Sequence, residues 1–525
     1  MYFRGLVNKR DAMSETSINL NSDGIVSSDM PEGRTRRRIG LILGPLLVCL
    51  LLIIGTPNGL IDVTGDPLQA DKAWFVLCVL VLMAVWWVTE AIPLPVTALL
   101  PLVLLPLMGV QSLKATSSEY MHPIIVLLLG GFIIAKAIER WDLHKRIALN
   151  VVNFVGYKPS MLVGGFMLAG ALLSMWISNS ATCIMLTPIA LSVASAVLGD
   201  NRFSSPFTYA LMLGIAYACS VGGLATPVGT PTNLIVIGYL NDTLGMDISF
   251  AQWISIGLPV VLILVPAIWF VLTKIVFKTP ASQLNSESGR ELVKSELGLL
   301  GGITGPEKRT LAIFVVVAFL WCFRGSLKEL SFFGMTPFSE LTDSITAIIG
   351  VFLCFLIPSG SKTEKSSAIL DWKTAESIPW GPLLLFGGGM SIAYAIRTSG
   401  LAEWVGLHLG GLATMPVILL VLLLTAFVVF ITEVMSNVAT ASTLMPILGA
   451  AALSSGLSVE LLALPIAMAA SCAFMLPTAT GPNAVVFASG EVSLPTMVKA
   501  GFMANLIAIP IITVLSLLLA PLIFG

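Results

Sequence analysis

The chain has 525 residues, of which 56% are hydrophobic and only 11% are charged, and its mean hydropathy is +0.94. A water-soluble protein of this length needs more charge to cover its surface, so the composition excludes that class. The formal net charge of −1 gives no indication of nucleic-acid binding, and the seven scattered cysteines lack the spacing of a disulfide framework or a zinc site.

The N-terminal segment, residues 1–38, is polar and contains the stretch NLNSDGIVSSDMPEGRTRRR. Its low hydrophobicity predicts a disordered tail. Arg34 and three further arginines at 36–38 come directly before the first apolar run. Because basic residues that flank a first span tend to remain in the cytoplasm, we expect a cytoplasmic N-terminus.

Apolar runs long enough to cross about 30 Å of hydrocarbon as helices recur along the rest of the chain. Two apolar stretches, 161–197 and 415–455, carry polar motifs near their middles, and we interpret each as a re-entrant hairpin that enters and leaves on one side. The predicted fold is therefore an all-α polytopic membrane protein with eleven crossings, two hairpins and an outside C-terminus. The predicted crossings are 39–55, 74–92, 93–110, 122–138, 207–224, 253–275, 310–325, 342–358, 380–396, 461–478 and 500–523.

The basic residues agree with this threading. It places 23 of the 28 lysines and arginines inside and five outside, namely Lys72, Lys114, Arg324, Lys328 and Arg397. This is the bias expected for a multi-pass protein of the plasma membrane. The longest predicted loop, 279–309, is then a cytoplasmic linker between a first half, 39–278, and a second half, 310–525.

Two short polar patterns recur at a constant offset. SNSAT begins at Ser178 and SNVAT begins at Ser436, 258 positions later, and the same offset relates the glycine pairs at 130–131 and 388–389. TPTN at 230–233 and TGPN at 480–483 match at an offset of 250. Because the first hairpin opens from inside and the second from outside, we expect inverted repeats, which are typical of secondary transporters. The alternative is coincidence in a chain rich in Gly, Ala and Leu.

Each half also contains a segment that should interrupt a membrane helix, GGLATPVGTPTN at 222–233 and LPTATGPN at 476–483. Backbone groups freed by such breaks must line a polar cavity, because lipid cannot satisfy them. Carbonyl, hydroxyl and amide oxygens suit a hard monovalent cation such as sodium, and helix N-termini suit a carboxylate. The tips carry no Lys, Arg or His, so a multiply charged anion would need accompanying cations. Alternatively, Ser and Asn could simply hold helices together.

Two glutamates fall within apolar runs, Glu90 and Glu433. Intramembrane carboxylates are functional candidates, and Glu433 lies beside a hairpin tip where it could tune a cation site or carry a proton. Alternatively, it could cap a helix end or pair with a backbone group. The three histidines, His122, His144 and His408, lack partners at ligand spacing, and we interpret them as structural.

The motifs resemble the divalent anion/sodium symporter family, which includes sodium-dependent dicarboxylate transporters. The resemblance covers about residues 39–525 and is carried by WWVTEAIPLPVTALLP, LLSMWISNSAT, VGGLATPVGTPTN, LLLFGGGM, FVVFITEVMSNVAT and SCAFMLPTATGPNAVVFASG. It implies homodimers in which a transport domain moves against a scaffold by elevator-type alternating access. It also implies that sodium ions are co-transported across the lipid bilayer.

Carried over by position, the resemblance implies two sodium sites and a substrate site between the tips. Sodium site 1 would use Ser174, Ser178, Asn179 and Gly229, and sodium site 2 would use Thr432, Ser436, Asn437 and Ala479. The substrate would lie near Asn179, Ser180, Asn437, Val438, Thr480 and Gly481. Three of these depart from the family pattern: Ser180 and Val438 replace threonine, and Gly481 replaces proline.

The function implied is sodium-coupled symport of a C4-dicarboxylate such as succinate, malate or fumarate. The departures leave another dicarboxylate, a tricarboxylate or an inorganic anion open as substrate. A sodium-independent anion exchanger on the same fold is the alternative mechanism, because it would need the same tips. A channel would show continuous polar periodicity along a pore. An enzyme would need a nucleophile, a base or a metal cluster, none of which the sequence indicates.

Overall fold

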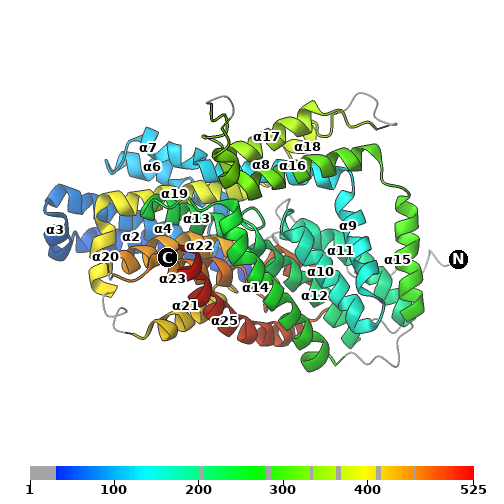
Figure 1. The fold of residues 1–525 in the computed structure, drawn as a ribbon. Coiled ribbons are helices and arrows are strands. Elements are labelled where there is room, and N and C mark those ends of the chain that lie inside the picture. Colours follow the sequence, from blue (N-terminus) through cyan, green and yellow to red (C-terminus); the bar gives the residue numbers. More distant parts are fainter. Residues whose placement is uncertain are drawn as a thin grey trace.

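The computed structural model describes residues 31–199, 205–278, 286–331, 335–361, 368–409, 415–454 and 456–524. Within these ranges the regular secondary structure is helical, apart from one isolated bridge between Pro358 and Ala368, and no strand occurs there. The ribbon in Figure 1 is accordingly a bundle of helices that cross at varied angles. The predicted all-α class is confirmed.

Eight helical stretches of the described residues are long and apolar enough to cross a bilayer, which confirms a polytopic membrane protein. They are Arg34–Ile54, Pro67–Thr89, Leu113–Arg140, Asn179–Leu198, Pro206–Ala225, Phe250–Val276, Gly305–Lys328 and Leu494–Phe524. They contain the helices α2 (Pro31–Ile54), α4 (Pro67–Thr89), α7 (Leu113–Ser118), α8 (Pro123–Arg140), α11 (Asn179–Leu198), α12 (Pro206–Gly222), α14 (Phe250–Phe270), α16 (Gly305–Lys328) and α25 (Leu494–Phe524).

Shorter helices make up the rest of the bundle. The predicted crossing at 93–110 consists of two short helices, because four prolines within it prevent one regular helix. The shorter helices include α3 (Asn58–Thr64), α5 (Leu94–Thr97), α6 (Leu100–Leu107), α9 (Leu143–Val155), α17 (Asp343–Leu356), α18 (Trp372–Ala375) and α20 (Leu401–Leu409). A further helix, α19 (Trp380–Ser399), has 20 residues.

Both predicted hairpins are pairs of helices joined by a short polar turn. The first consists of α10 (Pro159–Ser174) and α11, and the second consists of α21 (Val417–Ile431) and α22 (Asn437–Ser454). In each pair the SN motif supplies the turn and the first residue of the second helix. The side from which each hairpin enters the bilayer stays a prediction.

Both predicted helix breaks are present. The first separates α12 from α13 (Pro231–Leu244) and contains a 3-10 turn, Gly223–Ala225. The second separates α23 (Val459–Ala470) from α24 (Gly481–Ala488). It begins at Ser471, directly after α23 and five residues before the predicted start at Leu476.

Two predicted boundaries are wrong. Residues 31–38, predicted as part of a disordered tail, already belong to α2, because the arginines there are compatible with a helix that extends beyond its apolar part. Residues 1–30 lie outside the described part of the chain. The linker 279–309 is not a plain loop: it contains α15 (Ser286–Leu300) and the first turn of α16. Gly289 of α15 faces Val197 and Leu162, so one side of this helix packs on the first hairpin.

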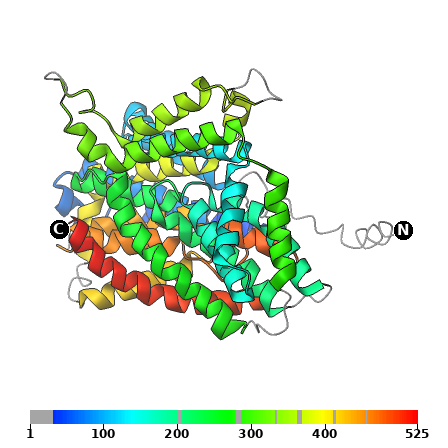
Figure 2. The same cartoon turned by 45° about the vertical axis from the view of Figure 1, so that its right-hand side comes forward.

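The helices fall into groups that persist between the two views. In Figures 1 and 2, α8, α16 and α17 lie together along one edge, while α10, α11 and α12 pack together with α9 and α15. The core is continuous across most of the bundle, and a second apolar cluster joins α4 with parts of α5, α19 and α20.

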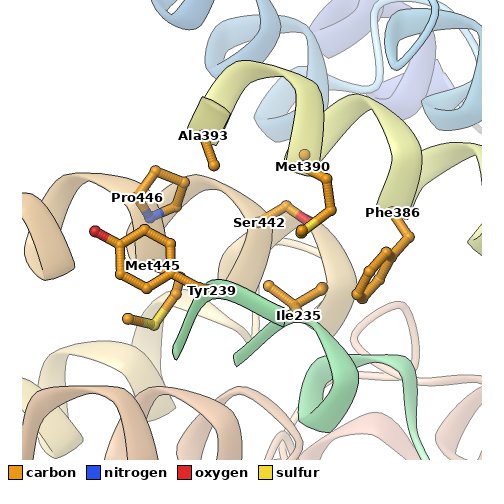
Figure 3. A pocket seen from close by; sticks show the side chains of 9 residues that line it. Ile235, Tyr239, Phe386, Met390, Ala393, Ser442, Met445 and Pro446 are labelled. Atoms are coloured by element: carbon orange, nitrogen blue, oxygen red, sulfur yellow. The ribbon is translucent and has the colours of Figure 1, made fainter. Parts of the chain in front are cut away.

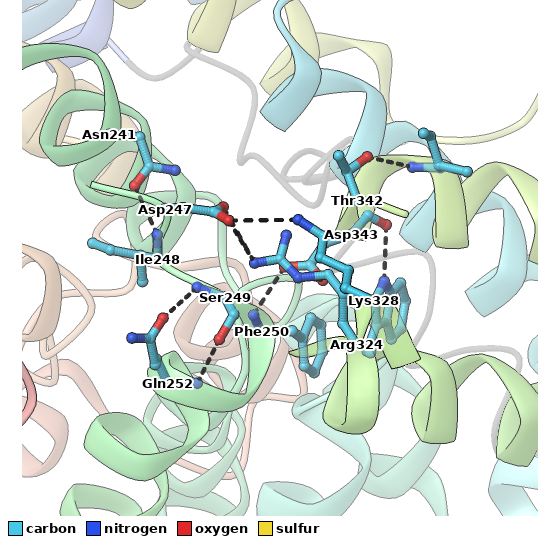
Figure 4. A network of polar contacts seen from close by, with 12 residues as sticks. Asn241, Asp247, Ile248, Ser249, Phe250, Gln252, Arg324, Lys328, Thr342 and Asp343 are labelled. Carbon is cyan, nitrogen blue, oxygen red and sulfur yellow. Dashed lines mark hydrogen bonds and ion pairs between the residues drawn. The ribbon is translucent and has the colours of Figure 1, made fainter. Parts of the chain in front are cut away.

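A polar network fixes the start of α14 against α16 and α17 (Figure 4). Asp343, the first residue of α17, accepts a hydrogen bond from the backbone N–H of Phe250 at 2.9 Å. Arg324 of α16 lies 3.4 Å from the Asp343 carboxylate and 3.2 Å from that of Asp247. Because Arg324 and Asp343 are both buried, each needs the other to offset the cost of leaving water.

Candidate functional site

A cavity of about 730 Å³ lies where the two hairpin turns and the two helix breaks meet. Every predicted site residue lines it except Ser174 and Thr432. The predicted residues that line it are Ser178, Asn179, Ser180, Gly229, Ser436, Asn437, Val438, Ala479, Thr480 and Gly481. Residues up to about 300 positions apart in the sequence thus surround one space, as the repeat predicts.

Four helices begin at this cavity: α11, α13, α22 and α24. Three of these helices, α11, α22 and α24, begin with an N-cap side chain that satisfies a backbone N–H without a partner in the helix. Ser178, Ser436 and Thr480 each accept such a bond at 3.2 Å, from Ala181, Ala439 and Asn483 respectively. A helix N-terminus carries partial positive charge, so the four starts together favour an anion in the cavity.

The first tip is held from behind by Ser174. Its Oγ donates to the carbonyl of Cys219 at 2.6 Å and contacts the Asn179 side chain. The Asn179 amide satisfies its neighbours with Nδ2 facing Ser174, the carbonyl of Cys219 at 3.2 Å and the carbonyl of Gly229 at 3.3 Å. Ser174 is fully buried and so supports Asn179 from outside the cavity lining.

The second tip repeats this arrangement with Thr432. Its Oγ1 donates to the carbonyl of Ala470 at 2.8 Å and lies 3.1 Å from Oδ1 of Asn437. Thr432 is also fully buried. Each asparagine at a tip is therefore fixed by a hydroxyl that is itself anchored to the end of a broken helix.

An asparagine one turn into the second part of each broken helix stabilises the break. Nδ2 of Asn233 donates to the carbonyls of Gly223 and Thr226, at 3.0 and 2.8 Å. Nδ2 of Asn483 donates to the carbonyls of Ala473 and Leu476, both at 3.0 Å. Buried backbone carbonyls without partners are costly, so these two side chains allow the breaks to exist inside the bundle.

The two breaks differ in how tightly they close. A side chain at Gly229 would place Cβ 2.4 Å from the carbonyl oxygen of Gly223, so only glycine fits there. The equivalent position in the second half is Ala479, whose methyl group is accommodated and buried. The first tip is thus more compact than the second.

Glu433 pairs with backbone groups, which was one of the two open interpretations. Its carboxylate accepts hydrogen bonds from three consecutive N–H groups, those of Phe474, Met475 and Leu476, at 2.7 to 3.1 Å. Nδ2 of Asn505 adds a fourth bond at 2.8 Å. Glu433 is 3% exposed and fixes the path of the second break. Position 175, its equivalent in the first half, is methionine.

Charged side chains at the C-terminal end of α8 also line the cavity, and the sequence analysis did not assign them. Lys136 and Glu139 form an ion pair at 2.7 Å, and Asp142 and His144 lie beside them. Glu90 lines the cavity as well, from the end of α4. The signal that could have identified Lys136 is its position within a predicted crossing, where a charge usually faces protein or water.

A family model described as "Sodium:sulfate symporter transmembrane region" matches residues 41–524. A sodium-dependent dicarboxylate transporter, SdcS, of Staphylococcus saprophyticus is 41% identical over 493 residues, which cover 93% of this chain and 92% of the relative. SdcS of Staphylococcus aureus strain MRSA252 is 41% identical over 497 residues, covering 94% of this chain and 92% of the relative.

Solved structures of two other transporters share the fold. The Alcanivorax borkumensis YdaH transporter aligns with a TM-score of 0.54 and 14% identity, over 86% of this chain and 97% of its own. Neisseria gonorrhoeae MtrF, described with a class of antimetabolite efflux pumps, aligns with a TM-score of 0.52 and 15% identity, over 77% and 83%.

The family and these relatives are transporters and not enzymes, which confirms that part of the sequence analysis. The family match spans nearly all of the apolar chain, and the same segment supplies both hairpins and both broken helices. This chain belongs to the sodium:sulfate symporter transmembrane family.

Proposed function

We propose that the protein is a secondary transporter that carries a C4-dicarboxylate, such as succinate, malate or fumarate, together with sodium ions. The observation that supports it most is the meeting of four helix N-termini and two asparagine-bearing tips at one cavity. Two tips that line one cavity suit a substrate with two carboxylates. The names of the SdcS relatives agree with this substrate class.

Sodium follows from the charge balance at the tips. The described tip residues offer hydroxyl, amide and backbone oxygens, and the nearest cationic side chain of the lining, Lys136, is paired with Glu139. A doubly charged anion would therefore gain from cations bound beside it. We assign these cations to the surroundings of Asn179 with Gly229, and of Asn437 with Ala479.

Ser174 and Thr432 would affect these cation positions indirectly, from outside the cavity lining. Each is buried and hydrogen-bonded to a backbone carbonyl and to the asparagine at its tip. We propose that they orient the asparagine oxygens, and that an ion contacting them directly would require the tip to shift.

For the mechanism we propose elevator-type alternating access within a homodimer, with a cytoplasmic N-terminus and an outside C-terminus. The hairpins and broken helices, α10–α14 and α21–α25, would move as a unit past the remaining helices. Support comes from the charge distribution of the sequence and from the repeated contacts at the two tips. In this arrangement the charged C-terminal end of α8 faces the cytoplasm.

The test is uptake of radiolabelled succinate into proteoliposomes with an inward sodium gradient, compared with a potassium gradient. We expect uptake only with sodium, and we expect Asn437→Ala to reduce it at least about 100-fold, since both cation and anion contacts depend on this side chain. Leu453→Ala, in the same helix but exposed and outside the cavity lining, is the matched control.

Two outcomes would contradict the proposal. Exchange from succinate-loaded vesicles without any sodium dependence would favour an anion exchanger on the same fold. Sodium-dependent uptake of citrate, tartrate or sulfate in place of succinate would keep the mechanism and replace the substrate.

A further inference from the structure

The C-terminal end of α13 makes polar contacts with two helices, α8 and α19, that lie outside the hairpins and the broken helices. Asp242 lies 3.2 Å from Nε2 of His122, the N-cap residue of α8. Thr243 accepts a hydrogen bond from Arg397, in the last turn of α19, at 3.4 Å. Glu119 lies within electrostatic range of His122, Asp242 and Arg397. These contacts are partly buried, and they link segments 120 and 154 positions apart in the sequence.

The helix end that carries these contacts is longer than its equivalent in the second half of the chain. α13 has 14 residues, whereas its equivalent α24 has eight. The six extra residues add about 9 Å of helix, and they carry Asp242 and Thr243. Each helix is then followed by five residues before the next one begins, at Phe250 and at Leu494. The difference therefore lies in the helix end itself, and Asp242 and Thr243 fall in the part of α13 that α24 does not have.

Around Ile235 and Tyr239 the contacts of α13 with α19 and α22 are mostly apolar, with Ser442 as a polar side chain among them (Figure 3). Ile235 and Tyr239 of α13 face Met390 of α19 and Met445 of α22 around a small void, and no ion pair occurs among the residues that line it. Apolar contacts are not directional, and methionine side chains adapt to a shifted neighbour. Hydrogen bonds and ion pairs, in contrast, fix one relative position of two helices.

The cavity and the polar contacts lie at opposite ends of α8. His122 stands before the first residue of this helix, and Lys136, which lines the cavity, lies 14 residues further on. This separation corresponds to a rise of about 21 Å. The polar contacts thus lie at one end of α8, and the cavity lies at the other.

We propose that Asp242 and Thr243 form a latch with His122 and Arg397, and that the latch must open before the cavity can face the other side of the membrane. This rests on the proposed alternating access of the transporter. The latch holds the conformation of the structure by directional contacts, while the apolar face of α13 permits sliding once the latch has opened. Because α24 lacks the corresponding residues, the latch favours one of the two conformations.

Cross-linking provides the first test. In a protein whose exposed Cys49 and Cys322 are replaced by alanine, His122→Cys and Asp242→Cys are combined and joined by a short bifunctional maleimide. The side chains of His122 and Asp242 are longer than cysteine and together bridge the distance between the two helices. Two cysteines at these positions therefore need a bridging reagent, and a direct disulfide is not expected. We expect sodium-dependent succinate uptake to fall at least about tenfold after cross-linking, while each single variant treated with the reagent keeps its uptake. Cross-linked protein that transports normally would overturn the proposal.

A second test needs no transport. Ile184→Cys places a thiol on a cavity-lining position that is 49% exposed. A membrane-impermeant maleimide applied from the latch side should reach it only when the latch is open. We expect Asp242→Asn and Arg397→Gln each to raise the labelling rate about fivefold, which corresponds to the loss of one polar contact. Glu287→Gln, which removes an exposed ion pair within α15, is the control and should leave the rate unchanged.

The two tests separate the latch from the substrate assignment. An unchanged labelling rate in both latch variants would overturn the latch, provided that labelling from the cavity side shows the variants to be folded. Latch-dependent labelling in a protein that takes up no succinate would leave the latch standing and would contradict the proposed substrate.

Discussion

In the first hairpin Ser174 anchors Asn179 to the carbonyl of Cys219, and in the second Thr432 anchors Asn437 to the carbonyl of Ala470. The supporting frames are therefore nearly the same. The surroundings differ, because Gly229, Ser180 and position 175 of the first half correspond to Ala479, Val438 and Glu433 of the second. The repeat therefore preserves the side chains that support the asparagines, while the other residues around the asparagines differ between the two halves.

Glu433 is where the two halves differ most in charge, and Glu433→Gln should have the largest effect. The neutral amide of glutamine cannot accept hydrogen bonds from three N–H groups as the carboxylate does. We therefore expect the free energy of unfolding to fall by about 3 kcal/mol. Thermal unfolding in detergent measures this loss. Met175→Leu at the equivalent position preserves volume and should cost less than about 1.5 kcal/mol. Equal losses in the two variants would show that the halves do not differ in this way.

Gly229→Ala tests whether the backbone is packed more tightly at the first helix break than at the second. The added methyl group would collide with the backbone of Gly223, so we expect a loss of about 2 kcal/mol and a rise of at least tenfold in the sodium concentration for half-maximal uptake. Ala479→Gly, the reverse exchange in the second half, should cost no more than about 1 kcal/mol. A Gly229→Ala protein with unchanged sodium dependence would contradict the compact first tip.

Ser180 and Val438 occupy equivalent positions at the two tips, and both line the proposed substrate site. Ser180→Val removes a hydroxyl from the cavity and should raise the half-saturating succinate concentration about fivefold, or roughly 1 kcal/mol. Val438→Thr adds a hydroxyl and should lower that concentration by up to about fivefold, while Val438→Ala should leave it nearly unchanged. If both hydroxyl exchanges have no effect, neither side chain faces the bound anion.

The sequence predicted the site in outline because its signals are local. A polar SN motif within an apolar run must turn or face a cavity, and dense Gly and Pro must break a helix in lipid. Both features are present, although the second break begins at Ser471, earlier than expected. The offset between the motifs also predicted that distant tips share one space, and the cavity lining agrees with this.

Other features depend on partners that are remote in the sequence. Serine and threonine at 174 and 432 could be predicted as site residues, but their place behind the asparagines depends on carbonyls supplied by other helices. His122 was interpreted as structural because no ligand stands near it in the chain, and its partner Asp242 is 120 positions away. The helix within 286–300 was missed because its polar composition resembles that of a loop.

The sequence by itself determined the membrane class, the helix breaks and the identity of the tip residues, because each follows from the cost of placing polar groups in hydrocarbon. Only the tertiary structure decided which carbonyls hold Asn179 and Asn437, how Glu433 is satisfied, and which end of α8 is closed. These depend on directional contacts between helices far apart in the chain, and local composition does not specify such contacts.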